Sequence, residues 1–111
     1  MQKKKMEKRK HRRVPIDGFS VEISDGIGFY SGTVLDISLC GIRMGELPAR
    51  LDGNASWIRA VITGHNASYR VFIKPRWTVL EGTNRTVGGT IVEPSWDWAD
   101  FVHCFEPEAR V

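Results

Sequence analysis

Two arginines, Arg9 and Arg13, stand four residues apart in a strongly basic N-terminal segment. Residues 1–13 hold eight of the sixteen Lys and Arg residues and one of the thirteen acids, whereas the rest of the chain holds eight bases and twelve acids. This uneven charge indicates an anionic partner, and phosphates, a membrane surface and an acidic protein all fit that description. A solvated tail would explain the same residues, so the arginine pair needs a second feature beside it.

A second group of polar residues, Asp36, Ser38 and Gly41, forms the pattern DxSxxG. It falls where one predicted strand ends and the chain must turn into the next. Asp, Ser and Gly are common turn residues, because Asp and Ser side chains bond to nearby backbone and Gly tolerates a positive φ. Taken alone, the pattern is explained by a purely structural turn.

Catalytic chemistry finds little support in the sequence. The three histidines, His11, His65 and His103, are scattered over the basic segment, a predicted turn and a predicted helix. No glycine pattern of a phosphate-binding loop occurs. Cys40 and Cys104 lack metal-ligand spacing and are expected to be buried, reduced thiols. We therefore expect a binding protein that is not an enzyme and that uses no metal or cofactor.

The elements that must position these residues are mostly strands, since apolar and polar residues alternate along much of the chain. Pro75 predicts a bulge or an edge, and Gly88 and Gly89 predict a close approach of backbone. Residues 47–54 are expected to form a loop. The expected strands cover residues 19–23, 29–37, 42–44, 57–63, 69–80 and 86–92.

The C-terminal segment changes to the period of a helix, with Trp98, Phe101, Val102 and Phe105 on one face and Ser95 as its N-cap. Strands followed by one such helix predict an all-β, mainly antiparallel fold. The specific expectation is a six-stranded β-barrel with a C-terminal amphipathic α-helix that covers one open side.

The length of 111 residues, 41% of them apolar, suits a single domain. Residues 1–13 are expected to form a flexible basic arm and residues 14–111 the barrel with its helix. No apolar run approaches the roughly 20 residues of a membrane helix, and no apolar signal core follows the basic start. The protein is therefore expected to be cytoplasmic, with no membrane insertion.

In this order, the two motifs resemble those of the PilZ domain family. The arginine pair matches the RxxxR motif of that family, the Asp-Ser-Gly pattern matches its DxSxxG motif, and 22 residues separate them. Trp77, the stretch 87–89 and the closing helix follow in the family's order, while Thr90 replaces a usually bulky apolar residue. The resemblance covers nearly the whole chain. It implies a six-stranded antiparallel barrel with a helix, and a bacterial receptor for the second messenger cyclic di-GMP.

The resemblance also implies a role for each motif residue toward a ligand with two phosphates and two guanines. Arg9 and Arg13 would bind the phosphates and the O6 and N7 acceptors of guanine, and Asp36 would accept from guanine N1–H and N2–H2. Ser38 would offer its hydroxyl, and Gly41 a positive φ and a close approach to the ligand. Candidate supplementary contacts are Lys8, Arg12 and Trp77.

Aromatic side chains are candidates for a platform on which a guanine stacks. Trp77 is preferred because its place relative to Gly88 and Gly89 matches a strand position that faces the family's site, and Tyr30 and Trp57 are the others. A tryptophan in the barrel core explains Trp77 equally well.

These observations predict a single-domain receptor that acts as an adaptor and passes the signal to a protein partner. Binding of cyclic di-GMP would order the arm over the barrel, and the partner would sense that change. The alternative is a small β-barrel that binds nucleic acid or an anionic surface through the arm. Its affinity would rise with the total charge of the arm, would fall steeply with salt concentration, and would be insensitive to Asp36→Ala. The roles of Lys3, Lys4 and Lys5 stay open.

Overall fold

The computed structural model describes residues 13–51 and 55–105. Seven strands and one helix make up this part of the chain, and every strand pairing is antiparallel. The elements are β1 (Val14–Pro15), β2 (Ser20–Ser24), β3 (Phe29–Ser38), β4 (Gly41–Pro48), β5 (Ile58–Gly64), β6 (Ala67–Glu81), β7 (Asn84–Ile91) and α2 (Trp96–Phe105).

The six longer strands close into a barrel. Going round it, β3 is followed by β2, β5, β6, β7 and β4, and β4 pairs again with β3. The short β1 pairs only with the C-terminal part of β3, where Val14 lies opposite Ile37 and Pro15 opposite Asp36. The fold expected from the sequence is therefore confirmed, with β1 as an added short strand that places Arg13 beside the end of β3.

Alternating residues of the strands fill the barrel interior. Val21, Ile62, Ile42 and Ile73 are 0% exposed, and their neighbours along each strand face outward. The β5–β6 hairpin turns through His65 and Asn66, both at positive φ, as a tight hairpin between twisted strands requires. The outward-facing positions include the motif residues Asp36 and Ser38, which neighbouring side chains largely cover.

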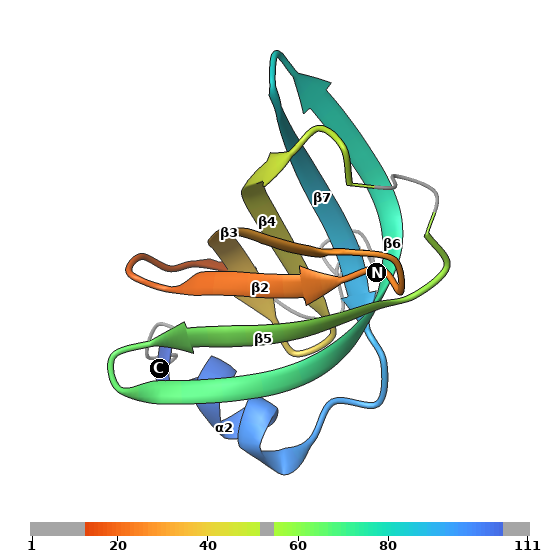
Figure 1. Ribbon diagram of the computed structural model, residues 1–111. Helices are drawn as coiled ribbons and strands as arrows, with labels where there is room; N and C mark the ends of the chain where they lie inside the picture. The colour runs from red at the N-terminus through yellow and green to blue at the C-terminus, as the bar shows by residue number, and fades with distance from the viewer. Residues whose placement is uncertain (1–12, 52–54, 106–111) are drawn as a thin grey trace, which may run out of the picture.

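Helix α2 closes one end of the barrel. Ser95 Oγ accepts a hydrogen bond from the backbone N–H of Trp98 at 3.1 Å, which confirms the predicted N-cap. Trp98, Phe101 and Val102 are buried, and the Phe101 ring stacks on Tyr69 of β6 with centroids 4.3 Å apart. Figure 1 shows α2 at the end of the barrel opposite the projecting β6–β7 hairpin.

Two expectations about this part of the chain are wrong. Strand β4 continues to Pro48, because Leu47 points into the core and pairs with Arg85 of β7, so the expected loop starts later. Neither cysteine is buried: Cys40 lies half-buried in the β3–β4 turn, and Cys104 is exposed on α2 away from its apolar face. Both are free thiols.

Candidate functional site: an arginine-clamped aspartate on the barrel wall

Asp36 lies between two arginines that come from different strands. Arg13 Nη1 donates to Asp36 Oδ1 at 2.7 Å, and Arg43 Nε donates to Asp36 Oδ2 at 2.8 Å. The Asp36 side chain is 11% exposed, against 33% for Arg13 and 43% for Arg43. A nearly buried carboxylate is thus held by two guanidinium groups that both remain open to solvent.

Two pairings of β3 bring these arginines to Asp36. Strand β1 places the residue before Val14, which is Arg13, beside the C-terminal end of β3. On the other side of β3, the β3–β4 hairpin pairs Ser38 with Gly41 and therefore Asp36 with Arg43. Directly opposed residues of antiparallel strands share a face, so the contact between Asp36 and Arg43 follows from the register.

Arg43 is the site residue that the sequence analysis missed. Leu39 and Cys40 are the two residues between the paired Ser38 and Gly41, and a turn of that length sets the register of the whole hairpin. A two-residue turn within the DxSxxG motif therefore predicts that its Asp faces the residue two positions after its Gly. This local rule would have found Arg43.

Gly41 creates space and not an unusual backbone conformation. It is not among the glycines with positive φ, so the expectation of a left-handed residue is wrong. A Cβ added at Gly41 would lie 3.0 Å from Ser38 Oγ and 3.7 Å from Arg13 Nη2. Because Gly41 lies in a regular strand, its extended backbone suits any residue, and what it supplies is room for the Ser38 hydroxyl and the Arg13 guanidinium.

A tryptophan of helix α2 holds the backbone of the β3–β4 turn from the core side. Trp98 Nε1 donates to the carbonyl oxygens of Ser38 at 3.2 Å and Leu39 at 3.0 Å. Trp98 is 1% exposed, so these bonds form in the core. The closing helix therefore holds the turn that presents Ser38 and Gly41.

Barrel closure extends the site across four strands. We call Asp36, Arg43, Gly88 and Trp77 the carboxylate row, because Asp36 pairs with Arg43, Arg43 with Gly88 and Gly88 with Trp77. A parallel hydroxyl row is formed by Ser38, Gly41, Thr90 and Lys74, paired in the same way. Paired residues share a face, so both rows lie on the outer wall.

Trp77 covers Gly88 on this wall. A Cβ on Gly88 would lie 2.3 Å from Trp77 Cε2, so the indole occupies the place of a Gly88 side chain. Trp77 is 41% exposed, which excludes the alternative of a core tryptophan. The close approach predicted at Gly88 and Gly89 is confirmed: the Trp77 indole lies over Gly88, and Ile73 and the Lys74 backbone lie against Gly89.

A β-bulge stands at each end of the carboxylate row. The register shifts between Val34 and Asp36 in β3 and again between Pro75 and Trp77 in β6, which confirms the bulge predicted at Pro75. The extra residue in β6 is Arg76, whose Nε donates to Thr90 Oγ1 at 2.9 Å. Bulges re-aim side chains and are frequent beside binding sites.

Charge on and beside the two rows is mainly positive. Arg13 and Arg43 bind Asp36, which is the one acidic residue of the rows, and Lys74 and Arg76 add positive charge on β6 beside Thr90. Guanidinium groups bind phosphates and planar acceptor edges, the carboxylate accepts from N–H donors, and a half-exposed indole stacks with bases. The arrangement suits a ligand that combines anionic groups with heterocyclic rings.

Several predicted contacts lie outside the described residues, namely Lys8, Arg9 and Arg12, as do Lys3, Lys4 and Lys5. Of the aromatic candidates, Tyr30 packs against the core, with the Arg50 guanidinium 5.1 Å from its ring centroid. Neither contact links Tyr30 to the two rows.

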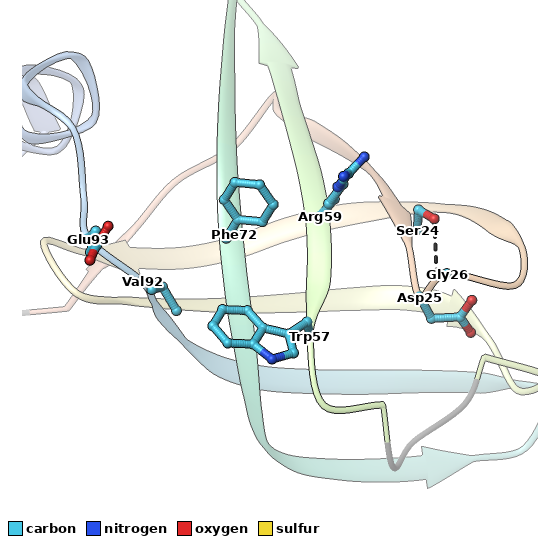
Figure 2. Close-up of a pocket in the computed structure, with 8 residues that line it drawn as sticks. All are labelled: Ser24, Asp25, Gly26, Trp57, Arg59, Phe72, Val92 and Glu93. Atoms are coloured by element: carbon cyan, nitrogen blue, oxygen red, sulfur yellow. Dashed lines mark hydrogen bonds between the residues drawn. The ribbon is translucent and has the colours of Figure 1, made fainter.

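Trp57 lines a separate groove of about 920 Å³ that contains no motif residue. Figure 2 shows Arg59 on β5, Phe72 on the neighbouring β6, and the ring of Trp57 just before the start of β5. The groove is lined by Ser24, Asp25, Gly26, Trp57, Arg59, Phe72, Val92 and Glu93.

Within residues 13–51 and 55–105, no group of three or more His, Cys, Asp or Glu side chains is placed to hold a metal ion. The helix in this part of the chain is too short and too polar to cross a membrane.

Replacing Gly88 with alanine is expected to push the Trp77 indole off the wall, because the new Cβ would overlap the ring. The ring is half-exposed and can turn outward, so we expect the free energy of unfolding to fall by only about 1 kcal/mol. Tryptophan emission should move to longer wavelength. The same substitution in a Trp77→Phe background should leave emission unchanged, and an equal change there would contradict the placement of Trp77.

Comparison with known proteins supports the fold. No protein-family model and no curated protein matches the sequence. The solved structure of the Bacillus subtilis inhibitor of motility, MotI/DgrA, is similar with a TM-score of 0.69 and 16% identity over 86% of this chain. The Borreliella burgdorferi PlzA protein, solved in complex with c-di-GMP, gives a TM-score of 0.65 and 8% identity over 85% of this chain. The aligned parts are 47% and 48% of those two chains, so this chain spans about half of each. The barrel and helix thus have a PilZ-like fold.

Proposed function

We propose that this protein is a receptor for cyclic di-GMP and that Arg9, Arg13, Asp36, Ser38 and Gly41 form its binding site. The observation that carries the proposal is the meeting of Arg13, Asp36, Ser38 and Gly41 at one end of β3, although 22 residues separate the two motifs. The PilZ-like fold and a structural neighbour solved with c-di-GMP support the same ligand.

The chemistry of the wall matches the two halves of the ligand. Guanine N1–H and N2–H2 are donors and require acceptors, which Asp36 supplies. A carboxylate accepts at about four lone-pair positions, so the two arginine bonds leave acceptor capacity on both oxygens. The arginines then serve the phosphates and the O6 and N7 edge of guanine, where a guanidinium fork binds two acceptors at once.

The site also needs the arginine pairs of Asp36 when no ligand is bound. Asp36 is nearly buried, and an unpaired carboxylate in that position would carry a large desolvation cost. Arg13 and Arg43 remove that cost in the free protein. In the complex, the guanine donors share Asp36 with the arginines or replace one of them, so the nearly buried carboxylate stays paired.

In this proposal, residues 1–13 transmit the signal to a partner protein. They act as a flexible arm on the barrel of residues 14–111, and Arg9 closes on the ligand with Lys8 and Arg12 as supplementary contacts. Arg13, the last residue of the arm, already bonds to Asp36, so ordering spreads from an anchored end. A protein partner that prefers the ordered arm is then recruited, which makes the chain a cytoplasmic adaptor without enzymatic activity.

Isothermal titration calorimetry with cyclic di-GMP tests the proposal directly. We expect binding in the micromolar range or tighter, and Arg13→Ala and Arg9→Ala should each weaken it by about 5- to 150-fold, the loss of one bidentate contact. Arg70→Ala is the matched control, because Arg70 lies on β6 opposite Val61 and away from both rows.

A folded protein that does not bind cyclic di-GMP would exclude the proposal. Binding that persists in both arginine variants would exclude the site. If short nucleic acids bind instead, with affinity that falls steeply with salt, the basic segment itself is the binding element.

A further inference from the structure

Arg43 belongs to neither motif, yet it stands in the centre of the carboxylate row. Asp36 lies opposite it on β3 and Gly88 lies opposite it on β7. Its Nε is fixed on Asp36 Oδ2 at 2.8 Å, and its side chain is 43% exposed. An anchored and accessible guanidinium is unlike the mobile head of an ordinary surface arginine.

The anchoring leaves a defined fork. Arginine has five N–H donors in one plane, of which Nε supplies one and the two Nη groups supply four. Because Nε donates to Asp36, the guanidinium plane is set by that bond and the Nη end is directed away from it. Such an end-on fork matches the paired O6 and N7 acceptors of guanine, whereas adenine presents a donor in place of O6.

Trp77 provides the neighbouring surface for the base. Directly opposed residues of antiparallel strands have Cα atoms about 4.5 to 5.5 Å apart. Arg43 and Trp77 both lie opposite Gly88, on the two strands that flank β7. Gly88 has no side chain, and the Trp77 indole lies over it, on the side of the wall where Arg43 stands. A base stacked on the exposed Trp77 ring therefore has an edge within reach of Arg43.

We infer that Arg43 is a ligand-binding residue that reads the O6 and N7 edge of the guanine stacked on Trp77, while it holds Asp36 for the motif site. This inference rests on the proposed function and adds a specificity residue outside both motifs. It also assigns the two ends of the carboxylate row to the two guanines. Three strand spacings, roughly 14 Å in all, separate those ends.

The test compares cyclic di-GMP with its 7-deaza analogue, in which N7 can no longer accept a hydrogen bond. Calorimetry is carried out on the parent and on Arg43→Gln, with Arg70→Gln as the control of equal charge change. We expect Arg43→Gln to weaken cyclic di-GMP binding by about 5- to 150-fold. The parent should bind the analogue several-fold more weakly than cyclic di-GMP. Arg43→Gln should show a clearly smaller difference, because only the other guanine then has an arginine at its N7 edge.

A residue that acts only through Asp36 would give another result. Its replacement would weaken both ligands equally and would preserve the preference for N7, which would overturn the inference. The inference is also overturned if Arg43→Gln binds cyclic di-GMP as tightly as the parent does. In either case the proposed function stands as long as the parent protein binds cyclic di-GMP. Should Arg43→Gln bind too weakly to measure, Arg43→Lys goes through the same comparison, since lysine keeps the charge but not the fork.

Discussion

Replacing Asp36 with alanine is expected to abolish selective recognition of cyclic di-GMP and to lower its affinity by about 10- to 100-fold. Hydrogen bonds to a charged acceptor contribute about 1.5 to 3 kcal/mol each, and Asp36 is the carboxylate on which the guanine donors are proposed to bind. The substitution also leaves Arg13 and Arg43 facing one another without the anion that now joins them. The loss of two charge-assisted hydrogen bonds should lower the free energy of unfolding by about 1 to 3 kcal/mol.

Binding measured by calorimetry, at a temperature where circular dichroism shows Asp36→Ala to be folded, separates the two effects. The competing model, in which the basic segment binds any polyanion, predicts that Asp36→Ala binds as well as the parent or better, because the variant is more positive. Glu22→Ala, which removes an exposed acid of β2 outside both rows, is the control for net charge. Parental affinity in Asp36→Ala would rule out the motif site.

Replacing Trp98 with alanine is expected to lower the free energy of unfolding by about 3 to 5 kcal/mol. The indole is 1% exposed, packs against Phe101 with centroids 5.3 Å apart, and donates to two carbonyl groups of the β3–β4 turn. Small domains are stable by only about 5 to 15 kcal/mol, so this single change removes a large share.

Thermal and urea unfolding measure this loss. Trp96→Ala is the matched control on the same helix, because Trp96 is 86% exposed. Its replacement should change the free energy of unfolding by less than about 0.5 kcal/mol. Trp98→Phe keeps most of the apolar surface but not the N–H donor. It should therefore weaken ligand binding more than its modest cost in stability predicts, since Ser38 and Gly41 would lose the support of the helix. Equal effects of Trp96→Ala and Trp98→Ala would contradict this account of the helix.

Local pattern was sufficient for much of the fold. Alternation located the strands, Ser95 and the apolar face located the helix, and Pro75 located a bulge that the structure contains. These features depend on neighbours within a few residues, which the sequence displays directly. The errors came where the pattern was ambiguous. Leu47 reads as the start of a loop yet lies in the core, and Gly41 reads as a left-handed turn residue yet lies in a regular strand.

By itself, the sequence determined the motif residues, their order and their place at the turn between two strands. Only the tertiary structure decided what surrounds them. Barrel closure pairs β4 with β7, and so brings Gly88 and Trp77 beside Arg43, while Trp98 reaches Ser38 from 60 residues away. The physical reason is that register between strands distant in the chain is set by how the whole set of apolar faces fills one interior, and no local spacing records that outcome.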